Sequence, residues 1–187
     1  MNLPPLDLDQ NAAWLQPVHR VISPNADDRP PCCNVELVVI HGISLPPGCF
    51  GGNEIQNLFC NTLDPHAHDY FRDLQALRVS AHLLIDREGF LTQFVSFRRR
   101  AWHAGVSSFQ GREQCNDFSI GIELEGTDIQ PYTPVQYQAL SRVLNVLMAA
   151  YPGIDRASIV GHCHVAPGRK SDPGDAFDWQ HLHALLE

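Results

Sequence analysis

The spacing of hydrophobic residues along the chain predicts a central sheet. Residues 35–41 form a nearly continuous apolar run, which is typical of a strand that is buried on both faces. Runs rich in apolar and β-branched residues predict four more strands, at 78–85, 90–97, 119–126 and 158–161. Because residues 86–89 have the composition of a turn, the strands on either side of them should pair as a hairpin.

A helical period appears after residue 133. Apolar side chains recur at helical spacing at positions 140, 143, 144, 147 and 151. Thr133, Pro134 and Gln136 have the spacing of a capping box with proline in the first turn, so they predict where this helix begins. Pro152 and Gly153 should end it. Shorter helices are expected at 53–60 and about 178–186.

This order of elements predicts the α/β (α+β) class: a single domain with a central mixed β-sheet flanked by helices. The chain has 187 residues, a length that fits one domain with a sizeable core. Residues 1–34 are rich in Pro, Asp and Asn, and we expect them to form an irregular N-terminal arm packed on a domain at 35–187.

Charge and composition narrow the possible partners. The formal net charge of −8 argues against a broad grip on nucleic acid or on an anionic membrane. The sequence contains no run of about 18 apolar residues, so it predicts no transmembrane helix. The N-terminus lacks the basic and apolar regions of a secretory signal, so a cytoplasmic location and free thiols at the six cysteines are expected. Nothing implies an obligate protein partner.

Potential catalytic residues gather near the C-terminus. The segment 162–174 holds His162, His164, Asp172 and Lys170, the only lysine beside twelve arginines. We expect this Pro- and Gly-rich segment to form a loop rather than a regular helix, and to hold its side chains through backbone shape. In an extended chain His162 and His164 would point to one side, and Cys163 away from it into the core.

His41, at the end of the first strand, could complete a zinc site with this segment. A catalytic zinc uses three protein ligands and keeps one open position, which His41, Asp172 and one of the two nearby histidines could provide. Lys170 could stabilise a developing oxyanion, and a carboxylate within the apolar strand 119–126 could move protons. Spacing alone does not choose between His162 and His164, or between Glu123 and Glu125.

Five segments resemble a known family. They are Val39–Gly48, Val79–Ile85, Arg100–Ser107, Asn116–Gly126 and Gly161–Gly174. Their motifs and order are similar to those of the zinc amidases that include phage lysozyme-type amidases and peptidoglycan recognition proteins, and especially to the cytosolic 1,6-anhydro-N-acetylmuramyl-L-alanine amidases. The resemblance runs from about residue 14 to residue 179, and it makes 35–187 a zinc amidase domain.

This resemblance implies specific roles. It assigns Zn²⁺ to His41, His162 and Asp172, and catalysis to Glu123 and Lys170. The implied reaction cuts the amide between the lactyl group of a muramyl sugar and L-alanine in small anhydromuropeptides, during peptidoglycan recycling. In some bacteria such substrates act as signals, which implies a link to β-lactamase induction.

The resemblance also implies substrate contacts at Arg78, Ala101 and Trp102, with Arg78 pairing with a peptide carboxylate. Trp102 could equally be a core residue. We expect His82 and His103 to line the pocket or to support the ligands. The chain departs from relatives at two positions: Ala81 replaces a tyrosine of many relatives, and Gln114 replaces an arginine, a loss for which Arg112 could compensate.

Three alternatives follow from the same residues. A non-catalytic sensor of peptidoglycan fragments usually lacks one zinc ligand, whereas all three positions are filled here. A lytic amidase that acts on polymeric cell wall would be expected to carry a secretory signal and a wall-binding domain. A structural zinc would have a fourth protein ligand.

Overall fold

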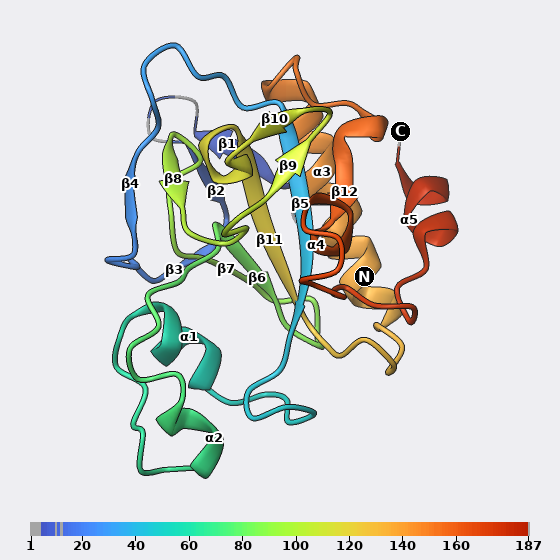
Figure 1. Ribbon diagram of the computed structural model, residues 1–187. Coiled ribbons are helices and arrows are strands. Elements are labelled where there is room, and N and C mark those ends of the chain that lie inside the picture. The colour runs from blue at the N-terminus through green and yellow to red at the C-terminus, as the bar shows by residue number, and fades with distance from the viewer. Residues whose placement is uncertain (1–4, 10, 12, 187) are drawn as a thin grey trace.

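A six-stranded sheet runs through the centre of the protein (Figure 1). This computed structural model describes residues 5–9, 11 and 13–186. The strand order is β12–β5–β11–β6–β7–β3, and every neighbouring pair is parallel except the antiparallel hairpin of β6 and β7. The strands are β3 (His19–Arg20), β5 (Leu37–Ile43), β6 (Leu83–Ile85), β7 (Leu91–Gln93), β11 (Ser119–Glu125) and β12 (Ile159–Gly161). The predicted mixed sheet and its hairpin are thus confirmed.

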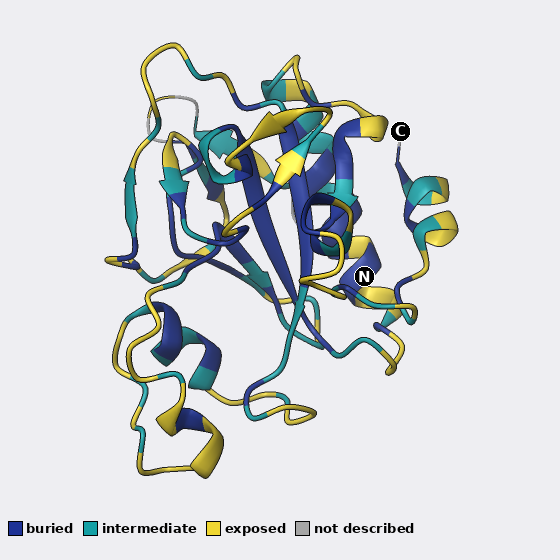
Figure 2. Cartoon of the chain, in the orientation of Figure 1, coloured by how far each residue is buried: buried dark blue, intermediate teal, exposed yellow. Residues whose placement is uncertain are grey.

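The strands β5 and β11 carry core residues on one face and the predicted site residues on the other. Val38 and Ile40 of β5 pack in the same cluster as the long helix α3 (Pro134–Ala150), whereas Leu37 and Val39 belong to a different cluster. Successive side chains of a strand point to opposite faces, so His41 lies on the face away from α3. Figure 2 shows β11 buried along its length and β5 buried over most of it, with half-buried residues only at its end, which agrees with the nearly continuous apolar run of β5.

The long helix begins where its sequence predicts. Thr133 Oγ1 accepts a hydrogen bond from the Gln136 backbone N–H at 3.2 Å, and Gln136 Oε1 accepts one from the Thr133 N–H at 3.0 Å. Replacing such a cap by alanine typically costs about 1 kcal/mol, so the capping box contributes measurably to the stability of this helix. The helix α5 (Trp179–Leu185) packs beside α3 and confirms the predicted C-terminal helix.

Short elements surround the sheet. The α1 and α2 segment lies between β5 and β6 in the chain and projects below the sheet in Figure 1. The remaining elements are β1 (Asp7–Asp9), β2 (Trp14–Gln16), β4 (Ala26–Asp28), α1 (Glu54–Phe59), α2 (Asp69–Arg72), β8 (Arg99–Ala101), β9 (Ser108–Phe109), β10 (Arg112–Glu113), the 3₁₀ turns Cys115–Asp117 and Arg156–Ser158, and α4 (His162–Val165).

The N-terminal arm is more regular than predicted. It contains four short strands, of which β3 joins the central sheet and β4 pairs with β8. Arg29 fastens its end to the domain, because its guanidinium donates to the carbonyl oxygens of Phe97, Asn116, Asp117 and Ser119. The Pro- and Asp-rich composition hid strands of two or three residues, whose pairing comes from the domain. Residues 1–4, 10 and 12 of the predicted arm, and residue 187 of the predicted domain, lie outside the described residues, and the predicted boundary at residue 34 stays a prediction.

Two predicted strands are shorter than expected. Regular pairing covers 83–85 and 91–93 rather than 78–85 and 90–97. Before residue 83 the chain bonds elsewhere: the Ser80 hydroxyl donates to the Asn25 carbonyl, and Ser80 and Trp102 exchange hydrogen bonds. The apolar content of these flanking residues reflects burial, which a strand and a buried loop share.

The prediction that no helix forms within 162–174 is wrong for its first turn. Residues 162–165 form the short helix α4, because the Pro and Gly of this segment begin only at Pro167. The expected extended geometry is therefore absent. His164 is exposed and packs near Trp179, while His162 is buried, and Cys163 is half-buried rather than part of the core.

The six cysteines are free, as predicted. Across the described residues we find no helix whose length and apolar character would let it cross a membrane.

Candidate metal centre

Three side chains from distant parts of the chain meet at one point. His41 Nδ1 lies 3.0 Å from His162 Nδ1 and 3.1 Å from Asp172 Oδ2, and His162 Nδ1 lies 3.0 Å from the same carboxylate oxygen. Within the described residues this is the group whose donor atoms could hold a metal ion together. The structure thus selects His162 over His164 as a partner of His41 and Asp172.

The donor set fits zinc. Zinc–ligand bonds of about 2.0–2.1 Å place two ligand atoms of a tetrahedral site roughly 3.3 Å apart, close to the observed spacing. His162 Nε2 lies 3.1 Å from the Ala104 carbonyl oxygen, which can only accept a hydrogen bond. A neutral ring would therefore carry its proton on Nε2, which would leave the lone pair of Nδ1 available for a cation beside the Asp172 carboxylate and His41. Three converging acceptors are the chemistry of a cation site.

Parallel strands bring these groups together. The register pairs His41 of β5 with Glu123 of β11, so the two side chains lie next to each other on the same face. β12 pairs with β5 on its other side and ends directly before His162. The site thus lies toward the carboxyl ends of three parallel strands, the usual position of ligand sites in such sheets.

Tyr132 fixes the segment that carries Asp172. Its buried hydroxyl donates to the carbonyl oxygen of Pro173 at 2.9 Å. The ring also passes over Gly42, where an added Cβ would lie 2.2 Å from the tyrosine oxygen. The absence of a side chain at Gly42 therefore leaves room for Tyr132. Tyr132 in this way connects the segment that carries His41 with the segment that carries Asp172.

Burial and mutual contacts set the charge states. Burial lowers the pKa of His41 to about 4, although its hydrogen bond to Asp172 acts in the opposite direction. Burial alone would raise the pKa of Asp172, but its contacts with His162 and His41 outweigh this and hold the pKa well below its ordinary value. Two neutral imidazoles and one carboxylate are the forms that bind zinc.

Glu123 is the unusual carboxylate of this site. Burial and the nearby charge of Asp172 raise its pKa well above the ordinary range, against the effect of Lys170. Its Oε2 is buried and has no hydrogen-bond partner among the described residues. Glu125 differs, because its oxygens accept hydrogen bonds from the backbone N–H groups of Gly51 and Arg87. Of these two glutamates, Glu123 lines the cavity that contains His41, His162 and Asp172, and Glu125 does not.

A cavity of about 680 Å³ opens at these residues. The exposed Lys170 lies on its wall together with the three converging donors and Glu123. Other lining residues form an apolar wall, which comes largely from the α1–α2 segment and the loop after β11: Leu58, Phe59, Tyr70, Leu74, Leu77, Val79 and Ile129. Tyr70, Leu77 and Ile129 are exposed although they are large and apolar. Several exposed apolar side chains around one cavity are typical of a binding surface.

The predicted substrate contacts are placed unequally. Trp102 lines the cavity, and its Nε1 donates to Asp27 Oδ1 at 3.1 Å, so it combines a structural contact with a surface for ligand. Ala101 is fully buried and does not line the cavity. Arg78 is exposed between two lining residues, and its guanidinium donates to the carbonyl oxygens of Gln75 and Leu77.

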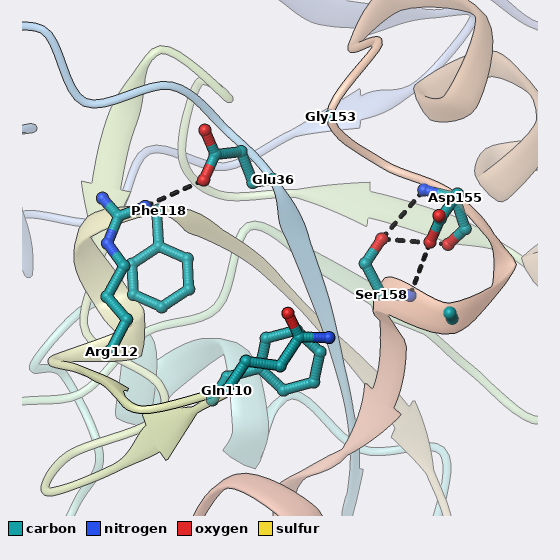
Figure 3. A pocket seen from close by; sticks show the side chains of 9 residues that line it. Glu36, Gln110, Arg112, Phe118, Gly153, Asp155 and Ser158 are labelled. Atoms are coloured by element: carbon teal, nitrogen blue, oxygen red, sulfur yellow. Dashed lines mark hydrogen bonds and ion pairs between the residues drawn. The ribbon is translucent and has the colours of Figure 1, made fainter.

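Arg112 lies in a different pocket, which Figure 3 shows. Its guanidinium pairs with Glu36 at 2.8 Å and stacks on the ring of Phe118. Glu36 precedes His41 by five residues, roughly 16 Å along a strand. The structure therefore does not bring Arg112 to the metal centre, because this ion pair and the aromatic ring hold it at the amino end of the sheet.

The two additional histidines are buried, and only His103 contacts the donor triad. His103 lines the back of the cavity, and its Nδ1 lies 3.0 Å from His41 Nε2. His82 accepts a hydrogen bond from the Gly121 N–H and contacts the Arg99 carbonyl oxygen, away from the cavity. Burial lowers the pKa of His82 to about 3, with a further contribution from the charge of Arg29.

Sequence reasoning did not identify the apolar wall or Tyr132. A large apolar residue within a polar segment, such as Leu77 or Ile129, is a weak signal of an exposed binding surface. No spacing in the sequence indicates that Tyr132 reaches Pro173, because the contact joins residues 41 positions apart.

Comparison with known proteins adds independent findings. The profile of the N-acetylmuramoyl-L-alanine amidase family matches residues 31–175. The 1,6-anhydro-N-acetylmuramyl-L-alanine amidase AmpD of Citrobacter freundii is 57% identical over 173 residues, which cover 92% of each chain. The crystal structure of a Se-Met AmpD derivative superposes with a TM-score of 0.93 at 56% identity, and covers 96% of this chain and 99% of that one.

A more distant structure includes a ligand. The amidase AmiD of E. coli, in complex with the substrate anhydro-N-acetylmuramic acid-L-Ala-D-gamma-Glu-L-Lys, superposes with a TM-score of 0.60 at 28% identity. The match covers 84% of this chain and 60% of AmiD.

Proposed function

Because the chain belongs to the N-acetylmuramoyl-L-alanine amidase family, a family of hydrolases, we propose that it cleaves anhydromuropeptides in peptidoglycan recycling. The bond cut is the amide between the lactyl group of 1,6-anhydro-N-acetylmuramic acid and L-alanine. One observation carries the proposal: the converging donors of His41, His162 and Asp172 open into a cavity that Glu123, with its unpartnered Oε2, also lines. The named substrate of the related AmiD supports the choice of ligand.

His41, His162 and Asp172 would hold the metal in this proposal. Zinc bound there would polarise the scissile carbonyl and lower the pKa of the attacking water to about 7. Burial lowers the pKa of His41, and the described residues provide three donor groups rather than four. Three protein ligands and access from a cavity favour a catalytic over a structural metal.

Glu123 is proposed as the proton carrier. Its unpartnered oxygen can accept a proton from the attacking water, and its raised pKa suits it to donate that proton to the nitrogen of L-alanine as the amide breaks. A carboxylate already satisfied by backbone N–H groups, as Glu125 is, would accept the same proton less readily.

Lys170 is proposed to stabilise the oxyanion. Lys170 lines the cavity two residues before Asp172, and its ammonium group would donate to the carbonyl oxygen as negative charge develops. We expect Lys170→Met to keep bound zinc and to lower kcat by about 10²–10³-fold, because a donor aimed at the transition state is lost. Lys170→Arg, which keeps the charge, is the matched control and should lose less. Near-normal kcat in Lys170→Met, measured by release of free peptide, would remove this lysine from the reaction.

The apolar wall and Trp102 are proposed to hold the substrate beside the metal. Arg78 is proposed to contact the peptide carboxylate, a role that requires its guanidinium to exchange its present carbonyl partners for a stronger, charged acceptor. The assignments of Ala101, His82 and Arg112 as substrate contacts stay predictions. So do the cytoplasmic location, the link to β-lactamase induction and the absence of nucleic-acid and obligate protein partners.

One experiment tests the proposed function as a whole. The purified protein is incubated with an anhydromuramyl tripeptide, with and without a chelator, and bound zinc is measured in the same sample. We expect one zinc per chain, and free tripeptide that forms only without chelator. Bound zinc without cleavage would instead indicate a sensor. Hydrolysis that is faster with intact sacculi than with soluble fragments would indicate a lytic amidase. Cleavage that survives complete zinc removal would contradict the metal assignment.

A further inference from the structure

Two consecutive residues contact the outer nitrogens of both histidine ligands. His103 Nδ1 lies 3.0 Å from His41 Nε2, and the Ala104 carbonyl oxygen lies 3.1 Å from His162 Nε2. Both contacts are buried. The segment 103–104 therefore lies behind the metal centre and touches each imidazole on the side opposite to its Nδ1.

These contacts decide where the imidazole protons are. The Ala104 carbonyl requires a proton on His162 Nε2, which leaves Nδ1 free. When His41 presents its own Nδ1 to the centre, its Nε2 carries the proton and donates it to His103 Nδ1. His103 then carries its proton on Nε2, which faces the Ser119 hydroxyl at 3.0 Å. Each proton of this arrangement has an acceptor, so the segment favours one tautomer of both ligands.

One side chain binds both backbone N–H groups of the segment. Asn116 Oδ1 accepts hydrogen bonds from the backbone N–H groups of His103, at 3.1 Å, and of Ala104, at 2.8 Å. Asn116 lies in the 3₁₀ turn before β11, and its own carbonyl oxygen accepts from Arg29 at 3.1 Å. A single amide oxygen thus holds both N–H groups of the backbone that presents the outer contacts, and Arg169 Nη2 donates to the Ala104 carbonyl oxygen.

The other side of the His103 ring is fixed by the sheet. An added Cβ at Gly121 would lie 2.3 Å from His103 Cγ, so the ring packs directly on the backbone of β11. The ring can approach this closely only because residue 121 is glycine. His103 is consequently held by β11 beneath its ring and by Asn116 through its backbone.

We propose that Asn116 is a positioning residue of the metal centre, which holds His103 and Ala104 so that both ligand imidazoles direct Nδ1 at the metal. The inference rests on the proposed zinc site and deepens it. Asn116 does not line the cavity, so it acts through the ligands and not on the substrate. Groups that orient metal-binding histidines typically change metal affinity by about 10–100-fold when they are removed.

The test compares zinc affinities of metal-free proteins by competition with a chromogenic chelator. We expect Asn116→Ala to weaken zinc binding by about 10–100-fold. Asn116→Asp keeps an oxygen acceptor and should recover most of the affinity. Asn57→Ala is the matched control, because it removes another half-buried amide, one that bonds Thr62, and it should bind zinc as the wild type does. Unchanged affinity in Asn116→Ala, or equal loss in Asn116→Asp, would overturn the proposal.

A second measurement is independent of the variants' folding. Long-range ¹H–¹⁵N NMR of the zinc-free wild type, at a pH where histidines are neutral, reports which ring nitrogen carries the proton. We expect His162 protonated on Nε2, and a proton on its Nδ1 instead would overturn the inference. In Asn116→Ala this preference should weaken while the melting temperature reports fold integrity. A wild type that binds no zinc yet shows the expected tautomer would count against the proposed function only.

Discussion

Asp172→Ala is expected to lose zinc and amidase activity together. Asp172 Oδ2 lies within 3.1 Å of the Nδ1 atoms of both His41 and His162, and it supplies the only negative charge among the three converging donors. Without it, two neutral imidazoles remain for a doubly charged ion, and the site lacks the three protein ligands typical of catalytic zinc. Activity should fall to background because the attacking water would no longer be activated at neutral pH.

The measurement is zinc content after dialysis, together with amide cleavage on the same preparation. Asp175→Ala is the control, since it removes an exposed carboxylate three residues further along the same segment. That variant should keep one zinc per chain and its activity. If Asp172→Ala retained stoichiometric zinc, Asp172 would not be a ligand. A circular dichroism spectrum like that of the wild type would exclude unfolding as the cause of the lost activity.

Glu123→Gln is expected to keep zinc and to lower kcat by about 10²–10⁴-fold. The substitution preserves the shape of the side chain but removes the ability to accept and return a proton, the contribution that a general base and acid makes to such reactions. Because Glu123 is buried and one of its oxygens has no partner, the amide should be accommodated without a large rearrangement. Single-turnover peptide release and zinc content are the two measurements.

Glu125→Gln is the natural control for this prediction. The two residues share a strand face, yet the Glu125 carboxylate binds the backbone N–H groups of Gly51 and Arg87. Its replacement should lower stability by about 1–3 kcal/mol through these buried contacts, with a much smaller effect on kcat. Equal losses of kcat in the two variants would show that Glu123 has no special role in proton transfer.

Local pattern predicted most of the secondary structure correctly. The helix 134–150 was identifiable because Thr133 and Gln136 form a capping box and because its apolar stripe has a helical period, both of which are local properties. The strand at 37–43 was identifiable because its run of apolar residues is nearly continuous, and the strand at 119–125 because apolar residues alternate along it. Elements of two or three residues, such as β3, have no such signal, since pairing with a distant strand creates them.

The predicted site residues divide in the same way. A lone lysine and a Pro- and Gly-rich segment around Asp172 drew attention to the C-terminal site, but the individual ligand roles came from family resemblance rather than from spacing. Spacing left His162 and His164 equivalent, and the structure separates them because one helical turn directs only His162 toward His41. Arg112 was a reasonable candidate by charge, but Glu36 holds it at the other end of the sheet.

The sequence by itself determined the class of fold, its main helix and strands, and the residue types available for metal chemistry, because these depend on neighbours within one or two turns of the chain. Only the tertiary structure decided which groups share a site. Parallel pairing sets His41 beside Glu123, and β12 delivers His162 to the same edge. Among the described residues, packing leaves Glu123 Oε2 without a hydrogen-bond partner, whereas both oxygens of Glu125 accept hydrogen bonds from backbone N–H groups. These relations join residues tens of positions apart. No local pattern in the sequence indicates which distant atom will form a hydrogen bond with a given group, or whether that group will have a partner.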